Sequence, residues 1–313
     1  MNVNYYERIN KNNKYLYIKN NKYLDNEDTI KLFNKIYIPP AYSSVKFYKK
    51  YNKIYATGID SAGRTQYKYL PDQNKKRKNN RNCKLYFINS KIESIMNDID
   101  KNLKNDTNPK NRNIALLLKI MYKCNFRIGN KIYEKKYGST GLTTIKKKHI
   151  YFLNNKVYIN FIGKKKVENK CIFIDKNLEK ILKKLYNNNK NYLFSYEEEG
   201  SYKDINVKDV NDYLKKYEIT NKDLRTWSAN FIFIFFMKKN FNLEDKKTKI
   251  INKSIKSTAK LMHNTFSVCK NSYLSENILN NLLENDKLYN KLKNKKLNIK
   301  SYINLLLSNL NCT

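Results

Sequence analysis

The hydrophobic positions of this 313-residue chain change their period along the sequence. Residues 1–71 contain short β-rich runs, interrupted by Pro39-Pro40, Gly58 and Gly63; the runs are KYLYI, KIYI, VKFY and TQYKYL. Such runs, bounded by proline and glycine, are typical of strands. We therefore predict a small, mostly β N-terminal domain over residues 1–75.

Beyond residue 83 most apolar residues recur at three- and four-residue spacing, which predicts helices. We expect them at 85–103, 113–124, 176–188, 206–217, 222–238, 246–262, 267–284 and 302–310. Residues 143–174 instead predict three strands, with turns at Asn154-Asn155 and around Gly163. The charged stretch 72–82 has no apolar residue and is expected to be a linker. The predicted fold is thus α+β, with a mainly helical domain over 76–313 that carries one three-stranded sheet.

The chain has a formal net charge of +37, from 64 basic and 27 acidic side chains. A positive field of this size indicates a polyanionic partner, most often nucleic acid. Part of the lysine excess has a neutral explanation, because Lys, Asn, Ile and Tyr dominate throughout, as in proteins of AT-rich genomes. Only seven basic residues are arginine, so we expect arginine where a bidentate guanidinium is needed. The seven are Arg8, Arg64, Arg77, Arg81, Arg112, Arg127 and Arg225.

The five cysteines are scattered and form no C-x-x-C pair. This pattern argues against a zinc site or a disulfide framework and favours an intracellular, reducing compartment. The longest apolar run, FIFIFFM at 231–237, is far shorter than the roughly 18 residues of a membrane span, so we expect a buried helix there. The N-terminus lacks the apolar stretch of a signal peptide.

The stretch GIDSAGRT, 58–65, nearly matches the phosphate loop G-x-x-x-x-G-K-[ST]. That loop requires a following helix, whereas QYKYL follows here, so we predict no nucleotide site. The other interpretation is a turn that presents Arg64, then a strand with Gln66 on one face and Tyr67 and Tyr69 on the other. Gln can pair with adenine, and Arg with guanine or phosphate. A plain surface hairpin explains the spacing equally well.

Three further basic residues are candidates for a site. Arg127 follows the apolar helix 113–124, and Arg225 lies at the start of the helix that contains FIFIFFM. An arginine beside such apolar sequence needs an anionic partner, either a ligand or one of the chain's acids, because an unpaired buried charge is costly. Lys164 lies at the expected tip of the hairpin YINFIGKKKVENKCIFI, although a lysine in this chain is by default a solvated surface group.

The segment LMHNTFSVCKNSYL, 261–274, contains a His263-Asn264 pair and, nine residues after Asn264, Tyr273. We expect Tyr273 on the polar flank of a helix whose apolar face is formed by Leu274, Ile278, Leu279 and Leu282. A tyrosine that only packs would not be placed there. Tyr273 is therefore a better candidate for chemistry than an average tyrosine among the 27 in the chain.

Taken together, these stretches resemble the type IB DNA topoisomerases, in the compact form of poxviruses, some giant viruses and some bacteria. The resemblance covers roughly residues 54–280, and the family's motifs occur in its order. They are ATGIDSAGRTQYKY, FRIGN with YGSTGLTTIKKKHI, FIGKKKV, KDLRTW and NTFSVCKNSYL. The expected fold is therefore that of the tyrosine recombinases and type IB topoisomerases.

The resemblance implies roles for individual residues. ATGIDSAGRTQYKY matches the DNA-contacting turn and strand of the family's N-terminal domain, so we expect Arg64, Gln66, Tyr67 and Tyr69 to bind DNA. Arg127 and Arg225 match the two catalytic arginines, Lys164 the catalytic lysine and Tyr273 the nucleophile. The fifth position is His or Asn in the family; Asn264 has the right spacing, and His263 is the alternative. Phe266 replaces the usual proline, which is only a convenience in a first helical turn.

The implied activity is relaxation of supercoiled duplex DNA by transient single-strand cleavage through a 3′-phosphotyrosyl link, followed by religation. It requires no ATP, metal or other cofactor. We expect duplex DNA as the partner, no membrane and no nucleotide, and a monomer. If the protein is viral, the host cytoplasm or the virion is its expected location.

Two alternatives remain open. A tyrosine site-specific recombinase shares the catalytic fold, but recombinases usually carry His-x-x-Arg at the second arginine, where this chain has Lys222 three residues before Arg225. A basic nucleic-acid-binding protein without enzymatic activity would explain the charge. It would not explain the ordered set of Arg127, Lys164, Arg225 and Tyr273.

Overall fold

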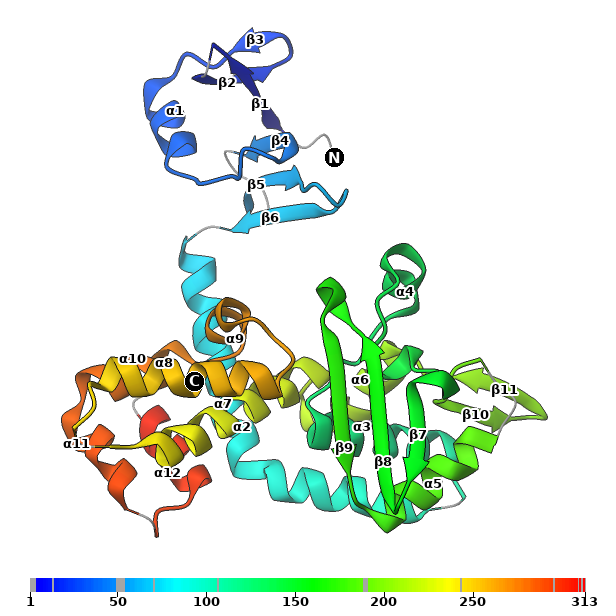
Figure 1. Cartoon of the computed structure of the whole chain (residues 1–313). Coiled ribbons are helices and arrows are strands. Elements are labelled where there is room, and N and C mark those ends of the chain that lie inside the picture. The colour runs from blue at the N-terminus through cyan, green and yellow to red at the C-terminus, as the bar shows by residue number, and fades with distance from the viewer. Residues whose placement is uncertain are drawn as a thin grey trace. The chain divides into compact units, whose positions relative to one another are not determined.

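The computed structural model describes residues 4–12, 14–48, 54–69, 71–105, 107–187, 191–242, 244–294, 296–308, 310 and 312. The chain forms two compact units, Met1–Asn79 and Asn80–Thr313, each with its own hydrophobic core. The first contains an antiparallel sheet and the second is mainly helical (Figure 1). This architecture confirms the predicted α+β fold.

The N-terminal unit is built on an antiparallel sheet in the order β3-β2-β1-β4-β5-β6. Its strands are β1 (Tyr5–Lys11), β2 (Lys14–Lys19), β3 (Lys22–Tyr23), β4 (Ser43–Tyr48), β5 (Ile54–Ile59) and β6 (Thr65–Tyr69). Helix α1 (Glu27–Asn34) was not predicted; Asn26 caps it by accepting a hydrogen bond from Thr29 N. Phe33 of α1 is fully buried against Tyr17 and Phe47 of the sheet.

The predicted strand KIYI, 35–38, is wrong. Ile36 N donates to Phe33 O, so the backbone still turns at the end of α1. Pro39 and Pro40 follow and have no N–H to donate to a neighbouring strand. Ile38 nevertheless enters the core, because a single apolar side chain can be buried from a loop.

The C-terminal unit consists of helices around a three-stranded sheet. The helices are α2 (Pro71–Lys104), which begins in the first unit, α3 (Pro109–Cys124), α4 (Lys131–Tyr137), α5 (Lys176–Asn187), α6 (Val207–Leu214), α7 (Asn221–Asn240), α8 (Lys247–Leu261), α9 (Phe266–Ser272), α10 (Glu276–Glu284), α11 (Asp286–Asn290) and α12 (Ile299–Leu307). The sheet has the order β7-β8-β9, formed by β7 (Ile150–Leu153), β8 (Lys156–Ile162) and β9 (Glu168–Phe173). Short 3-10 turns lie at Leu142–Thr144, Lys147–His149, Lys164–Lys166, Lys215–Tyr217 and Lys291–Lys293.

The pattern of three strands with turns at Asn154-Asn155 and Gly163 is confirmed, and most predicted helices are present. The hairpin of β10 (Ser195–Glu198) and β11 (Ser201–Asp204) was not predicted. Ser195 and Tyr196 are buried, but most of its residues are polar or charged, so its sequence shows no alternating apolar pattern. Leu70 and Asn188, which end predicted elements, and Asn309, which lies within one, are outside the described residues.

The stretch 72–82, predicted as a linker, is helical, because α2 runs through it without interruption. The boundary between the two units, after Asn79, falls within this stretch. Pro71 suits the first turn of a helix, and lysine, arginine and glutamine are good helix formers. Once later turns are packed, adding a polar turn to the same helix costs little. Leu85, Ile88, Ile92 and Ile95 provide that packing.

The expectation of unpaired cysteines is also wrong. Cys83 pairs with Cys312, and Cys124 pairs with Cys171, whereas Cys269 is a free, buried thiol. The pairs are 229 and 47 residues apart in sequence. Spacing reveals disulfides only when both cysteines belong to one local motif, so these pairs were invisible before the fold was known.

We expect the Cys124–Cys171 bond to raise the free energy of unfolding by about 4 kcal/mol, because it closes a loop of this length in the unfolded chain. Urea unfolding of the oxidised protein, compared with Cys171→Ser, measures this difference. Cys83→Ser serves as the matched control that opens the other disulfide. Thiol titration of the oxidised, denatured protein should find a single free thiol; five free thiols would show that the pairs do not form.

Candidate active site

Five predicted site residues lie on different elements of the C-terminal unit. Arg127 follows α3, Arg225 lies in α7, His263 and Asn264 follow α8, and Tyr273 follows α9. Hydrogen bonds connect these segments to one another, as described below. The sixth residue, Lys164, lies on the loop between β8 and β9.

Arg225 is held in the second turn of α7, whose N-terminus is fixed by a capping box between Thr220 and Asp223. Its guanidinium is only 5% exposed and donates hydrogen bonds to three other segments. Nε donates to Asn125 O at 3.1 Å, Nη2 to Met262 O at 2.5 Å, and Nη1 to the hydroxyl of Tyr273. Arg225 therefore connects the segments that follow α3, α8 and α9.

Burial lowers the pKa of Arg225 to about 10, with Tyr273 opposing this shift and the neighbouring Arg127 adding to it. The side chain thus stays cationic at neutral pH. Among the described residues, neither Arg225 nor Arg127 forms an ion pair with a carboxylate. The positive charge of the two guanidiniums is therefore uncompensated within this part of the chain.

Arg127 is half-buried beside Arg225. Its Nη2 donates to Asn264 Oδ1, and its Nη1 donates to His263 O at 3.4 Å. Since Arg225 binds the carbonyl of Met262, the two arginines hold consecutive peptide groups after α8. This arrangement brings both guanidiniums to one side of the 262–264 turn.

Asn264 is the residue whose hydrogen bonding is incomplete. Its Oδ1 accepts from Arg127, but its buried Nδ2 has no hydrogen-bond partner among the described residues. A buried donor without a partner costs about 1–3 kcal/mol, so such an atom in a native structure calls for an acceptor. Its position beside two guanidiniums suits an oxygen atom of an anion.

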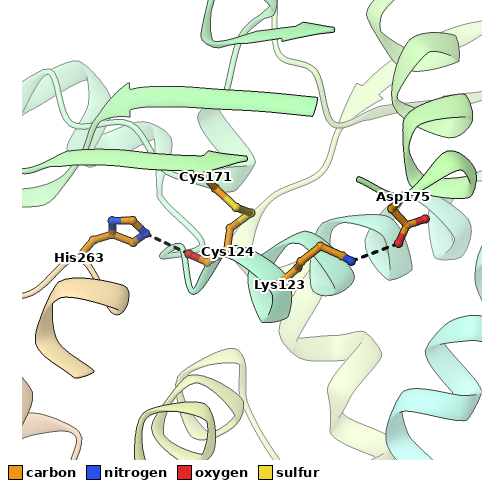
Figure 2. Close-up of a disulfide and its surroundings, with 5 residues drawn as sticks. All are labelled: Lys123, Cys124, Cys171, Asp175 and His263. Carbon is orange, nitrogen blue, oxygen red and sulfur yellow. Dashed lines mark hydrogen bonds and ion pairs between the residues drawn. A yellow bond between two sulfur atoms is a disulfide. The ribbon is translucent and has the colours of Figure 1, made fainter. Parts of the chain in front are cut away.

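His263 is directed elsewhere. Its Nε2 lies 3.0 Å from the carbonyl oxygen of Cys124 (Figure 2). Its ring packs on Phe126. Because a carbonyl oxygen only accepts, Nε2 must carry the proton. Burial lowers the pKa of His263, and both arginines lower it further. The side chains of the two candidates for the fifth position thus point to different partners.

The environment of Tyr273 corrects its predicted position. We expected one helix over 267–284 with Tyr273 on its polar flank; instead α9 ends at Ser272 and α10 begins at Glu276. Tyr273 is buried, at 9% exposure. The break arises because Ser275 caps α10 by accepting from Ile278 N, which requires extended backbone at Ser275.

Two residues that hold the backbone around Tyr273 were not among our candidates for the site. Asn230, fully buried in α7, donates from Nδ2 to Tyr273 O and accepts at Oδ1 from Ser275 N. Arg81 of α2 donates to the carbonyls on either side, those of Ser272 and Leu274. Asn230 could have been noticed as an asparagine within an apolar helix. Arg81 could have been noticed because arginine is scarce in this chain.

The segment that carries Arg127 is fixed by a close approach of two backbones. A Cβ atom on Gly141 would lie 2.4 Å from Gly129 Cα, so neither position accepts a side chain without movement. Gly129 also has a φ of +86°, in the left-handed region that favours glycine. The contact lets Leu142 N donate to Arg127 O at 3.0 Å, which fixes the position of the Arg127 backbone.

Lys164 is exposed on a tight loop between β8 and β9. Gly163 N donates to Val167 O, and a Cβ on Gly163 would meet Asn169 Nδ2 at 2.4 Å. The Cys124–Cys171 disulfide joins β9, the strand after this loop, to the end of α3, just before Arg127 (Figure 2). The loop and the Arg127 segment are therefore connected covalently as well as by packing.

The N-terminal unit contains the other predicted contacts. β5 and β6 form the expected hairpin, and its turn carries Arg64. The rings of Tyr67 and Tyr69 stack 6.3 Å apart on one face, while Gln66 lies on the other, as predicted. Arg64 and Gln66 both bind the carboxylate of Asp60, a residue that was not predicted.

In the described part of the chain, no group of three or more His, Cys, Asp or Glu side chains is placed to hold a metal ion. The same part contains no helix long and apolar enough to cross a membrane. The site offers a phenol hydroxyl beside two guanidiniums and an amide donor without a partner among the described residues. These groups are suited to bind a tetrahedral oxyanion next to a reacting hydroxyl.

Comparisons with known proteins agree with this chemistry. The family described as "Eukaryotic DNA topoisomerase I, catalytic core" matches residues 69–302. DNA topoisomerase 1B of Acanthamoeba polyphaga mimivirus is 32% identical over 278 residues, 83% of this chain and 81% of that protein. DNA topoisomerase 1B of Vaccinia virus (strain Copenhagen) is 28% identical over 268 residues, and DNA topoisomerase I of Monkeypox virus 29% over 269, with 82% of each chain covered. The chain therefore belongs to the type IB DNA topoisomerase family, as the motifs in its sequence predicted.

Proposed function

We propose that this protein relaxes supercoiled duplex DNA by cutting and resealing one strand through a 3′-phosphotyrosyl intermediate on Tyr273. The observation that carries the proposal is the hydrogen bond from buried Arg225 to the Tyr273 hydroxyl, beside Arg127 and the unpaired donor of Asn264. A phosphodiester brings the negative oxygens that these donors lack. Family membership supports the same activity.

In the cleavage step, the Tyr273 oxygen attacks phosphorus and its proton passes to water. The bond between phosphorus and the 5′-oxygen breaks, which leaves a 3′-phosphotyrosine and a free 5′-hydroxyl. Arg127, Arg225 and Asn264 donate hydrogen bonds to the non-bridging oxygens, whose charge rises in the transition state. Religation is the reverse reaction, with the 5′-hydroxyl as the attacking group.

The leaving 5′-oxygen needs a proton, and we assign its donation to Lys164. The lysine is exposed on its loop, where a bound duplex can reach it. The disulfide between Cys124 and Cys171 supports this assignment, because it ties the strand after the loop to the segment before Arg127.

The reaction exchanges one phosphodiester for another, so it should need no nucleotide. The two guanidiniums supply the charge that a metal ion supplies in other phosphoryl-transfer sites, and we propose that no metal takes part. All the proposed catalytic groups come from one chain, so a monomer suffices. Relaxation of supercoiled plasmid in the presence of EDTA and without ATP tests these points; binding without relaxation would contradict the proposal.

Replacement of the nucleophile separates chemistry from binding. We expect Tyr273→Phe to abolish relaxation and covalent capture of DNA, while duplex affinity stays within about threefold, because affinity comes mainly from phosphate contacts. A nicked duplex and a denaturing gel detect the covalent complex. Covalent capture by the Phe variant would show that another residue is the nucleophile.

The two candidates for the fifth position should behave differently. We expect Asn264→Ala to slow cleavage by roughly 10²-fold, the usual effect of removing one donor to a transition-state oxyanion. Asn264→His should recover part of the rate, because its ring retains an N–H. His263→Ala should instead lower stability, since its ring binds the Cys124 carbonyl, and leave single-turnover cleavage nearly unchanged. The reverse ranking of the two Ala variants would assign the role to His263.

A sulfur substitution tests Lys164. We expect Lys164→Ala to slow cleavage by roughly 10²–10⁴-fold, the range for a positioned proton donor. A substrate with sulfur in place of the 5′-leaving oxygen should restore the rate, because a thiolate leaves without a proton. Lys165→Ala is the matched control on the same loop and should cost little. Rescue of Arg225→Ala by sulfur, or no rescue of Lys164→Ala, would require another proton donor.

A further inference from the structure

The carboxylate of Asp60 organises the turn between β5 and β6. Its Oδ1 accepts from the backbone N–H groups of Ala62 and Arg64, at 3.0 and 3.1 Å. Its Oδ2 accepts from Arg64 Nε at 2.8 Å and from Gln66 Nε2 at 2.9 Å, and lies 2.7 Å from Arg64 Nη2. A single, nearly buried side chain thus contacts two of the side chains expected to meet DNA in this unit, Arg64 and Gln66.

The contact with Asp60 determines which way the Gln66 amide faces. The hydrogen bonds from Arg64 lower the pKa of Asp60 to about 2, so the carboxylate is ionised in neutral solution. An ionised carboxylate only accepts hydrogen bonds, so the nitrogen of the amide must face it. The remaining edge of the amide then offers one N–H donor and one oxygen acceptor. In the described part of the chain, that oxygen has no other partner.

One donor beside one acceptor is the complement of adenine in the major groove. Adenine offers N7 as an acceptor and the N6 amino group as a donor, whereas guanine offers the two acceptors N7 and O6. A glutamine that is free to turn can offer either its oxygen or both N–H groups. A glutamine fixed by Asp60 can only offer the mixed pattern.

We propose that Asp60 is a specificity-determining residue, which makes the N-terminal unit prefer adenine at one position of the duplex by fixing the Gln66 amide. The inference rests on the proposed function, because it requires duplex DNA as the ligand. Asp60 itself touches no base. It is a positioning residue that acts through Gln66, and it holds Arg64 in the same way.

The Asp60→Asn variant separates this role from simple closure of the turn. The oxygen of the introduced amide can still accept from the backbone N–H groups of Ala62 and Arg64, which places the amide nitrogen where Oδ2 was and releases the Arg64 guanidinium. That nitrogen donates, so the Gln66 amide turns its oxygen toward it and leaves both N–H groups for the base. The variant should therefore exchange an adenine preference for a guanine preference at one position.

The experiment uses the full chain with Tyr273→Phe, so that bound DNA is not cut, and a duplex pool with randomised sequence. Four proteins are compared by sequencing the bound fraction: the parent, Asp60→Asn, Gln66→Met and the double variant. The parent should enrich adenine over guanine roughly fivefold or more at one position, the usual discrimination of a bidentate contact. Asp60→Asn should reverse that ratio, and Gln66→Met should remove it. The double variant should match Gln66→Met, since Asp60 acts through Gln66.

Thermal unfolding checks that each variant is folded, and 7-deazaadenine in the preferred duplex gives a test without any variant of Asp60 or Gln66. This base lacks the N7 acceptor and should weaken binding by the parent but not by Gln66→Met. An unchanged adenine preference in Asp60→Asn, or no adenine preference in the parent, would overturn the inference while duplex binding still stands. Failure of the parent to bind any duplex would overturn the proposed function itself.

Discussion

A buried cation, with no carboxylate partner among the described residues, is the constraint on which the C-terminal unit depends. Arg225 lies inside a helical core, and its five N–H donors cannot be left unsatisfied there. Carbonyls from two loops and the hydroxyl of Tyr273 accept its hydrogen bonds. Loops after α3, α8 and α9, far apart in sequence, must therefore converge on one side chain. The need for acceptors for the Arg225 donors therefore brings the residues of the site together.

The remaining charge gives that site its selectivity. Carbonyl oxygens solvate a guanidinium but do not neutralise it, so Arg225 and Arg127 keep a net positive charge beside one another. The lower pKa of Arg225 reflects burial first and the proximity of Arg127 as a smaller contribution. An anion with several oxygens relieves both effects at once and also provides an acceptor for Asn264 Nδ2. A neutral ligand would relieve neither, so the site favours a phosphodiester over a neutral group.

Periodicity could predict most of the fold because it reports which faces are buried. The helices and the three-stranded sheet have strong apolar patterns, and the hairpin with Gln66 opposite Tyr67 and Tyr69 follows from strand alternation. The failures share a cause: α2 enters a polar stretch by propagation, and the Cys124–Cys171 pair depends on tertiary proximity. Neither leaves an apolar pattern in the local sequence.

The same limit explains which parts of the site were missed. Motif order could select Arg225 and Tyr273 as candidates, but could not show that α9 stops at Ser272 and that the tyrosine is buried. Asn230 donates to the Tyr273 carbonyl from within an apolar helix. One polar residue in such a helix does not change the hydrophobic pattern, so it does not attract attention in the sequence. Asp60 lies within the stretch GIDSAGRT, 58–65, but its contact with Gln66 becomes visible only when the fold of the turn is known. Residues that position others are found from contacts, because their partners are set by the fold.

The charged and unpaired groups of the site lower the stability of the fold, and contacts at Cys124 reinforce the backbone beside them. Two neighbouring cations and an unpaired buried donor destabilise the empty site, and Asn125, which accepts from Arg225, has a φ of +55° at the end of α3. A left-handed Asn is a common way to end a helix, and this turn directs its carbonyl toward Arg225. The Cys124–Cys171 bond holds the turn from the adjacent residue, and His263 binds the carbonyl of the same Cys124 (Figure 2). A cross-link elsewhere, such as Cys83–Cys312, would restrict the unfolded chain but would not fix this turn. The position of Cys124 therefore couples the stability of the fold to the geometry of the arginines.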